Sequence, residues 1–188
     1  MRHHYLDIRL LRDPEFTSHQ LMSALYAKLH RGLAQLHTSS IGVVFPEYDA
    51  TRCSVGAQLR LVGAVNELDR LMCREWLRGM LDHVVVSPVA TVPEGTAHRA
   101  LRRVQAKSNP ERLRRRQMKR HKLSAAEAIE RVPDTVTQRL NLPFVQLTSS
   151  STGQAFRLYL RLDDSQAGPV AGPFNTYGLS GSATVPWF

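Results

Sequence analysis

Cysteines, aromatic residues and long apolar runs are all scarce in this chain of 188 residues. The two cysteines, Cys53 and Cys73, are far apart and have no second pair, so they predict neither a disulfide framework nor a zinc site. No apolar run approaches the roughly 20 residues that cross a bilayer, and the N-terminus lacks the apolar core of a signal peptide. We therefore expect a protein of the reducing cytoplasm.

Motifs that hold metals, phosphates or paired catalytic carboxylates are also absent. The sequence has no CxxC, no HExxH and no Walker-type glycine loop. Its eight histidines are scattered, and His30 and His37 lie two helical turns apart, too far along a helix axis to chelate one ion. We expect no bound metal and no cofactor.

Acidic residues are almost missing from one segment, residues 102–122. Ten of the 25 basic residues but only one of the 16 acidic residues, Glu111, lie there, so the rest of the chain carries 15 of each sign. The formal net charge of +9 therefore belongs to this segment alone. A solvated surface helix usually carries both signs, so the segment favours binding to a polyanion.

The segment has the signals of a helix. Ser108 or Asn109 can cap it, and Pro110 suits a first turn, where a missing N–H costs nothing. At about 100° per residue, Arg114 points away from a broad cationic arc flanked by Leu113 and Met118. The arc consists of Arg112, Arg115, Arg116, Lys119, Arg120 and Lys122. Two apolar residues are too few for a membrane-surface helix, so we favour nucleic acid as the partner.

The first half of the chain has the element order βαββαβ. Strands are expected at residues 4–12, 41–45, 56–61 and 83–86, a long helix from Pro14, and a second helix capped at Asn66 and including Trp76 and Leu77. This order is typical of the ferredoxin-like arrangement, which hosts many functions. Residues 56–61 lack the aromatic residues with which RNA-recognition modules of that fold stack bases.

The second half begins after a predicted linker at residues 88–98. Beyond the basic helix, a capping box at Ser124–Glu127 opens a short helix ended by Pro133, and residues 142–162 have the pattern of a hairpin. The fold class expected is α+β, with a ferredoxin-like domain at residues 1–94 and a second α+β, RNA-binding domain with the arginine-rich helix at residues 95–188.

Two polar residues stand at positions where chemistry is conceivable. His30 adjoins the apolar stripe of the long helix, next to Leu29, where it could face a cleft. Spacing alone favours an ordinary hydrogen-bonded histidine at the core edge. Ser149 likewise is a turn serine on the pattern alone.

Several motifs in order resemble the type I-F CRISPR repeat-processing endoribonucleases, the Csy-type nucleases of precursor crRNA. The resemblance covers essentially the whole chain. The motifs lie at residues 4–10, 28–30, 41–43, 103–116, 129–135, 151–154, 177–180 and 185–188.

The resemblance implies a metal-independent ribonuclease that cuts each CRISPR repeat at the base of its RNA hairpin. The 2′-OH next to the scissile phosphate is the nucleophile, and the products are a 5′-OH and a 2′,3′-cyclic phosphate. His30 matches the catalytic histidine, Ser149 the serine that holds the 2′-OH, and Tyr177 a tyrosine that orients the histidine. The sequence does not divide the roles of base and acid.

The resemblance also assigns the RNA contacts. Arg103 and Gln105 match readers of the last stem positions, consistent with the pairing of Arg to guanine and Gln to adenine. Phe156 matches the aromatic residue that stacks on the terminal base pair, worth roughly 1–3 kcal/mol. The remaining candidates are Lys107, Ser108, Arg112, Arg115, Arg116, Lys119, Arg120 and His121.

The expected partners are the CRISPR repeat hairpin and the other subunits of the type I-F interference complex, in which the enzyme stays on the 3′ hairpin of the crRNA. The alternatives are a non-catalytic subunit that binds the RNA hairpin and a DNA-binding accessory protein. The presence of His30, Ser149 and Tyr177 together favours the enzyme. The absence of dimer heptads and of a helix-turn-helix partner disfavours DNA binding.

Overall fold

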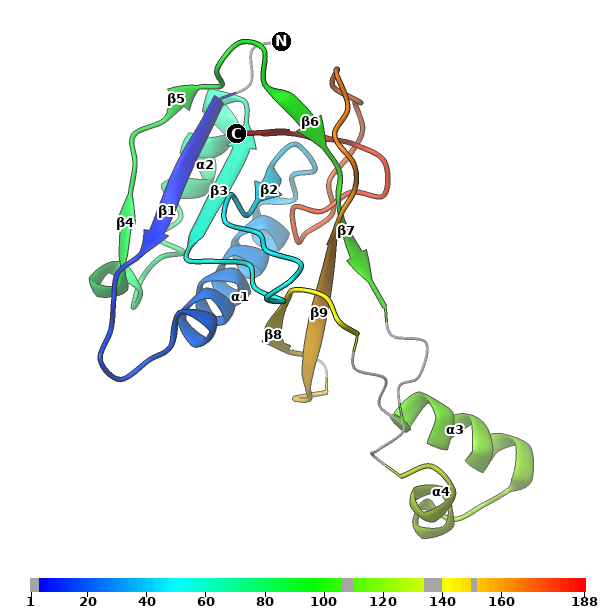
Figure 1. Ribbon diagram of the computed structural model, residues 1–188. Coiled ribbons are helices and arrows are strands. Elements are labelled where there is room, and N and C mark those ends of the chain that lie inside the picture. The colour runs from blue at the N-terminus through cyan, green and yellow to red at the C-terminus, as the bar shows by residue number, and fades with distance from the viewer. Residues whose placement is uncertain (1–3, 106–109, 134–139, 150–151) are drawn as a thin grey trace. The chain divides into compact units, whose positions relative to one another are not determined.

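The computed structural model of the chain describes residues 4–105, 110–133, 140–149 and 152–188 (Figure 1). Helices and strands both contribute, and the chain has the mixed α+β character expected from the sequence. The elements are β1 (His4–Leu10), α1 (Ser18–Leu36), β2 (Gly42–Val44), β3 (Gln58–Gly63), α2 (Val65–Met72), the 3₁₀ turn η1 (Leu81–His83), β4 (Val84–Val86), β5 (Ala90–Thr91), β6 (Ala97–Arg99), β7 (Leu101–Val104), α3 (Pro110–His121), α4 (Ala125–Arg131), β8 (Phe144–Thr148), β9 (Ala155–Leu162) and β10 (Val185–Trp187).

Contacts between residues divide the chain into two compact units. Unit 1 consists of Met1–Arg103 together with Leu142–Phe188, and unit 2 is Val104–Asn141. Unit 2 is thus an insertion between two parts of unit 1. The predicted boundary after residue 94 separates two domains that would each fold independently. The division by contacts does not test independent folding, so this boundary stays a prediction.

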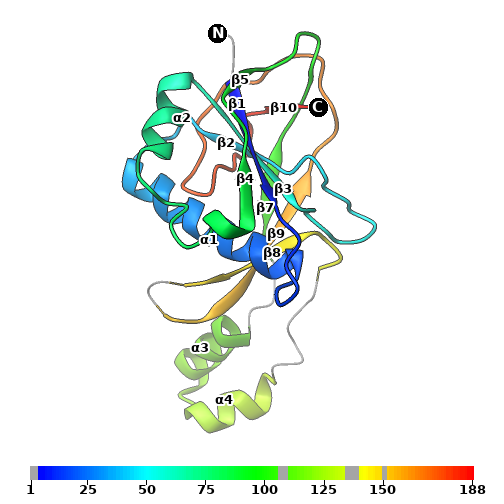
Figure 2. The ribbon, with the colours of Figure 1, turned by 90° about the vertical axis from the view of Figure 1, so that its left-hand side faces the viewer.

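The main sheet of unit 1 has the order β2-β3-β1-β4, with antiparallel neighbours, and β5 also pairs with β1. The alternation expected in β1 places Leu6, Ile8 and Leu10 in the core. Helices α1 and α2 lie on the same face of this sheet (Figure 2). The core between these helices and the sheet includes Leu25, Leu29 and other buried residues of α1.

The two helices begin differently from the sequence prediction. Helix α1 starts at Ser18, after a capping box in which Thr17 and Gln20 bond reciprocally, and not at Pro14. Asp13 instead accepts the backbone N–H groups of Glu15 and Phe16, which closes a separate bend. A side-chain cap therefore decides the helix start here, and the proline does not.

Helix α2 is also shorter than predicted, and the cap predicted at Asn66 is wrong. Its N-cap is Ala64, which makes no side-chain cap bond, and the helix ends at Met72. Trp76 and Leu77 lie beyond it yet are buried, at 8% and 5% exposure. Burial in a turn segment imitated the apolar spacing of a helix.

The predicted linker at residues 88–98 holds two short strands. Strand β5 pairs with β1, and β6 pairs with β10. The linker interpretation was therefore wrong for this part of the chain. These strands form against partners remote in sequence, and runs of two and three residues are too short to show the alternation of a strand.

The predicted hairpin at residues 142–162 is confirmed as β8 and β9, which form a three-stranded sheet with β7. The backbone N–H of Gln146 donates to the Ser23 hydroxyl of α1 at 3.0 Å. Val145 and Leu147 of β8 are buried in the same core as α1. The hairpin is thereby fixed against the helix that carries His30.

Unit 2 contains a helical pair, α3 and α4. Ser124 caps α4 in the predicted box with Glu127, and Lys122 adopts a left-handed conformation (φ 51°) between the helices. Ala128 and Val132 are buried, and Arg114 of α3 donates its Nε–H to the Val132 carbonyl at 2.8 Å. Arg114 therefore faces the end of α4, which agrees with the direction away from the cationic arc predicted from the helical spacing.

Candidate active site and RNA-binding surface

His30 lies on α1 and is half-buried at the edge of the core. Its Nδ1 is 2.9 Å from the backbone carbonyl oxygen of Thr176. A carbonyl only accepts, so Nδ1 must carry the proton, and in the neutral imidazole Nε2 is the basic nitrogen. The tautomer with an unprotonated Nε2 is therefore set by the backbone carbonyl of Thr176.

The His30 ring also stacks on Tyr177. The ring centroids are 3.9 Å apart and the planes differ by 7°. With the Thr176 contact, this stacking fixes both the tilt and the rotation of the imidazole. A side chain held in this way has little conformational freedom left to lose when a ligand binds.

The loop that supplies Thr176 and Tyr177 is a tight turn organised by Asn175. The Asn175 side-chain oxygen accepts the backbone N–H groups of Tyr177 and Leu179, and its carbonyl accepts that of Gly178. Asn at the first and Gly at the fourth position is a known turn preference. This signal in the sequence could have identified the turn, but the role of the Thr176 carbonyl has no side-chain signature.

Gly178 is required by the approach of this turn to β2. Its φ is +68°, and a Cβ there would lie 2.4 Å from Cγ2 of Val43. The Gly178 carbonyl accepts the backbone N–H of Val43 at 3.0 Å. The turn is thus fastened to the core of unit 1.

Arg103 and Phe156 extend the site. The Arg103 guanidinium lies 5.8 Å from the centre of the Phe156 ring and 5.9 Å from that of Tyr177. Distances below about 6 Å are those of cation–π contacts. Four of the predicted site residues, His30, Tyr177, Arg103 and Phe156, are thereby connected within unit 1.

Ser149 follows the last residue of β8. Its backbone N–H donates to the Gln154 carbonyl at 2.8 Å, which continues the ladder of the hairpin. Phe156 pairs with Leu147, so alternation along the strand places Ser149 on the hairpin face that carries Phe156. The role of Ser149 stays a prediction.

The remaining candidate RNA-binding residues lie in the segment after β7 and in α3. Gln105 is exposed just after β7, whereas Lys107 and Ser108, with the predicted cap at Asn109, lie outside the described residues. Arg112 is in α3, but its side chain is outside the described part. Among the α3 side chains that the structure describes, those of Arg115, Arg116, Lys119, Arg120 and His121 are exposed.

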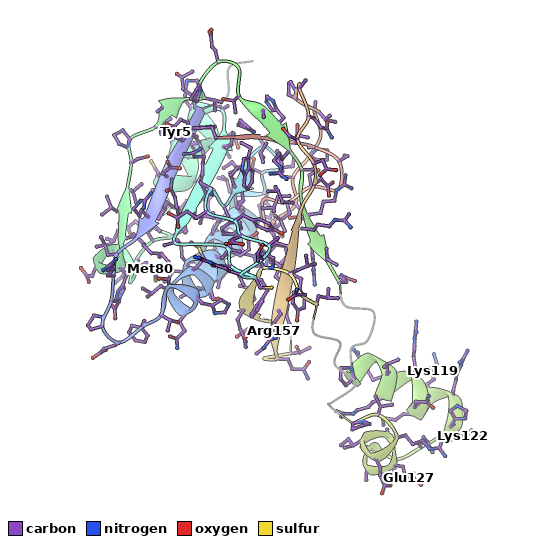
Figure 3. The ribbon with its side chains drawn as sticks, viewed as in Figure 1. Tyr5, Met80, Lys119, Lys122, Glu127 and Arg157 are labelled. Atoms are coloured by element: carbon purple, nitrogen blue, oxygen red, sulfur yellow. The ribbon has the colours of Figure 1, made fainter. Side chains whose placement is uncertain are left out.

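One cation of α3 and the acidic residue of the α4 capping box lie on different sides of the helical pair. Figure 3 shows Lys119 and Glu127 projecting from opposite sides of it. Leu113 and Met118 are half-buried, as expected for residues flanking the cationic arc. Unit 2 thus has the one-sided cationic surface predicted from the sequence.

The described ranges of the chain contain no group of three or more His, Cys, Asp and Glu side chains placed to hold a metal ion. Within the same ranges, no helix is long and apolar enough to cross a membrane.

A model of the CRISPR-associated protein family Cas_Csy4 matches residues 5–188. The chain belongs to this family. It is 51% identical to the "CRISPR-associated endonuclease Cas6/Csy4" of Pseudomonas aeruginosa (strain UCBPP-PA14) and 46% identical to the protein of the same name in Escherichia coli (strain UTI89 / UPEC). Each comparison covers 98% of this chain and 99% of the relative.

Membership of Cas_Csy4 confirms the resemblance found in the sequence, and the names of these relatives agree with the expected class of CRISPR endonuclease. A solved structure described as "An RAMP protein binding different RNA substrates" covers 98% of this chain at 10% identity, with a TM-score of 0.34. A likeness that weak carries no argument.

Proposed function

We propose that this Cas_Csy4 protein is a metal-independent endoribonuclease that binds the stem-loop of the CRISPR repeat and cuts precursor crRNA at the base of the hairpin. The observation that carries the proposal is His30, which is held by Thr176 and Tyr177 with Nε2 as its basic nitrogen. The names of the curated relatives support the same class of reaction.

The reaction is an attack by the ribose 2′-OH on the adjacent phosphorus. The O2′–P bond forms, the P–O5′ bond breaks, and the products are a 2′,3′-cyclic phosphate and a 5′-OH. A base must accept the 2′-OH proton, and an acid must protonate the leaving oxygen. His30 Nε2 takes part in this proton transfer, Ser149 holds the 2′-OH, and Tyr177 keeps the imidazole in place.

RNA binding uses two different kinds of contact. The cations of α3, namely Arg112, Arg115, Arg116, Lys119, Arg120 and the neighbouring His121, meet the phosphates along the stem, with Lys107 and Ser108 just before the helix. Arg103 and Gln105 read the last base pairs of the stem, and Phe156 stacks on its end. The cation–π contact of Arg103 with Phe156 supports one shared platform for these two functions.

The remaining parts of the proposal concern fold and assembly. The antiparallel order β2-β3-β1-β4 supports assignment of residues 1–94 to the ferredoxin-like type. The enzyme keeps its product and remains on the 3′ hairpin of the crRNA, together with the other subunits of the type I-F interference complex in the cytoplasm. Tight product binding is expected where recognition of the stem does not depend on the bond that is cut.

The test is cleavage of a labelled repeat hairpin from the protein's own CRISPR array, in EDTA. A second hairpin carries a single 2′-deoxy sugar at the cut site. We expect the RNA to be cut with chelator present and the deoxy hairpin to be bound but uncut. His30→Ala should abolish cutting and leave hairpin affinity nearly unchanged.

The matched control is His19→Ala, which removes an exposed histidine of the same helix that contacts Phe144. It should cut at the wild-type rate. If the wild-type protein binds both hairpins tightly and cuts neither, the protein is a non-catalytic hairpin-binding subunit. If His30→Ala cuts normally, the catalytic assignment is wrong.

A further inference from the structure

Two side chains of α1 hold two consecutive carbonyls of the turn at Asn175. The Tyr26 hydroxyl donates to the Tyr177 carbonyl at 2.7 Å, and His30 Nδ1 donates to the Thr176 carbonyl at 2.9 Å. Residues four apart lie on one face of a helix, one turn from each other. The turn is therefore attached to α1 by two hydrogen bonds. The bond from Tyr26 comes from a fully buried side chain, one helical turn before His30.

Tyr26 is placed rigidly. It is fully buried, with a ring 5.7 Å from that of Phe45 and nearly parallel to that of Tyr177, 6.5 Å away at 18°. Burial raises the pKa of its hydroxyl well above the ordinary value, with a further contribution from Tyr177. The hydroxyl is thus a permanent donor, and a buried donor must find a partner.

The hydrogen bond from Tyr26 to the Tyr177 carbonyl also affects the two groups that hold His30. The Tyr177 carbonyl and the Thr176 carbonyl belong to adjacent residues, so a shift of one moves the other. The same turn carries the Tyr177 ring that stacks on the imidazole. Both constraints on His30 therefore depend on where the turn sits along α1.

We propose that Tyr26 is a positioning residue for His30, whose hydroxyl fixes the turn so that the Thr176 carbonyl and the Tyr177 ring hold the imidazole in its working orientation. Tyr26 acts through these two residues. The proposal rests on the proposed function, because it assigns Tyr26 to the ribonuclease site.

The test compares Tyr26→Phe with Tyr48→Phe. The Tyr48 hydroxyl also donates to a backbone carbonyl, that of Leu160 at 3.1 Å, and Tyr48 has no placed role in the site. Each variant loses one hydroxyl–carbonyl bond and no ring. Thermal unfolding of both, with all assays well below the lower transition, separates stability from positioning.

Two readouts are taken. In single-turnover cleavage at saturating protein, Tyr26→Phe should be slower by about tenfold, since small misplacements of a catalytic group are costly. Its affinity for the 2′-deoxy hairpin should stay at the wild-type value. In proton NMR of the protein without RNA, the Nδ1–H signal of His30 should broaden or vanish in Tyr26→Phe and persist in Tyr48→Phe.

The outcomes distinguish the two proposals. If the wild-type protein does not cut RNA, the proposed function fails, while the NMR signal still shows whether Tyr26 holds His30. If the wild-type protein cuts, and Tyr26→Phe matches Tyr48→Phe in rate and in the His30 signal, the positioning role of Tyr26 is overturned. Equal losses of rate in both variants would overturn it as well, because they would indicate a general effect on stability.

Discussion

Replacement of Gly178 by alanine tests how the turn beside His30 is held. The new Cβ would lie 2.4 Å from Cγ2 of Val43, a fully buried residue, and the φ of +68° is one that L residues avoid. The conformational penalty is about 1–2 kcal/mol, and forced repacking of a tight core adds about 1–3 kcal/mol. We expect Gly178→Ala to lose about 2–5 kcal/mol of unfolding free energy.

The matched control is Gly95→Ala. Gly95 has a similar φ of +72°, but a Cβ there meets no atom of the described residues within 4 Å. This variant should lose only the conformational penalty, about 1–2 kcal/mol. The difference between the two variants in urea unfolding then measures the collision with Val43.

Cleavage supplies the second assay for Gly178→Ala. Displacement of the turn moves the Thr176 carbonyl and the Tyr177 ring, so single-turnover cutting should fall by about a hundredfold, while Gly95→Ala cuts normally. The reasoning is refuted if Gly178→Ala is no less stable than Gly95→Ala and cuts at its rate.

Three further predictions concern other parts of the chain. Asp7→Asn should cost about 1.5–3 kcal/mol in urea unfolding, because Arg60, 7% exposed in its side chain, would lose the charge of Asp7 and one of two hydrogen bonds to it but keep its bond to the Phe188 carbonyl; a loss below about 1 kcal/mol would contradict this. Arg115→Ala should weaken hairpin binding and reduce the slope of log K against log salt by about one phosphate contact, and an unchanged slope would remove Arg115 from the interface. Hydrogen bonds from the Ser124 hydroxyl and backbone N–H lower the pKa of Glu127, so its stabilisation of α4 exists above its ordinary pKa of 4.5 and is lost as pH falls through the lowered value. NMR shifts should therefore show α4 fraying as the pH is lowered below the ordinary pKa of 4.5, and a helix unchanged until this carboxyl is fully protonated would disprove the role of this cap.

Local signals in the sequence predicted some elements well. The α4 capping box and the hairpin at residues 142–162 depend on residues that are neighbours in the chain, so their patterns are complete within a short window. The cationic arc of α3 and the opposite direction of Arg114 followed from the helical repeat alone.

Elements that depend on remote partners were missed. Strand β5 pairs with the start of β1, beyond the part of β1 that pairs with β4, and β6 pairs with β10, so both depend on partners that a short window of sequence does not contain. The start of α1 was misplaced because Pro14 and Thr17 both carry signals of a helix start, and the complete capping box at Thr17 prevailed. In each case tertiary or reciprocal bonds outweighed a single-residue preference.

The residues of the candidate site likewise include some that the sequence identified and one that it could not. His30, Tyr177, Arg103 and Phe156 were identified by resemblance, and the structure connects them through rings and a guanidinium. Thr176 was not identified, because it acts through its backbone carbonyl and any side chain could provide that atom. A pattern of residue types cannot indicate an acceptor that every residue possesses.

The basic segment and the candidate catalytic residues lie in different parts of the chain and left different patterns in the sequence. The excess of basic residues is confined to residues 102–122, which fall mostly in unit 2, whereas His30 and its partners lie in unit 1. Charges act on phosphates over about 8–10 Å and tolerate variation in their placement, whereas proton transfer requires placement within a fraction of an ångström. Under the proposed function, the cationic helix therefore needs only a dense, one-sided arc, whereas His30 needs a turn closed by Asn175 and Gly178 and fastened to β2.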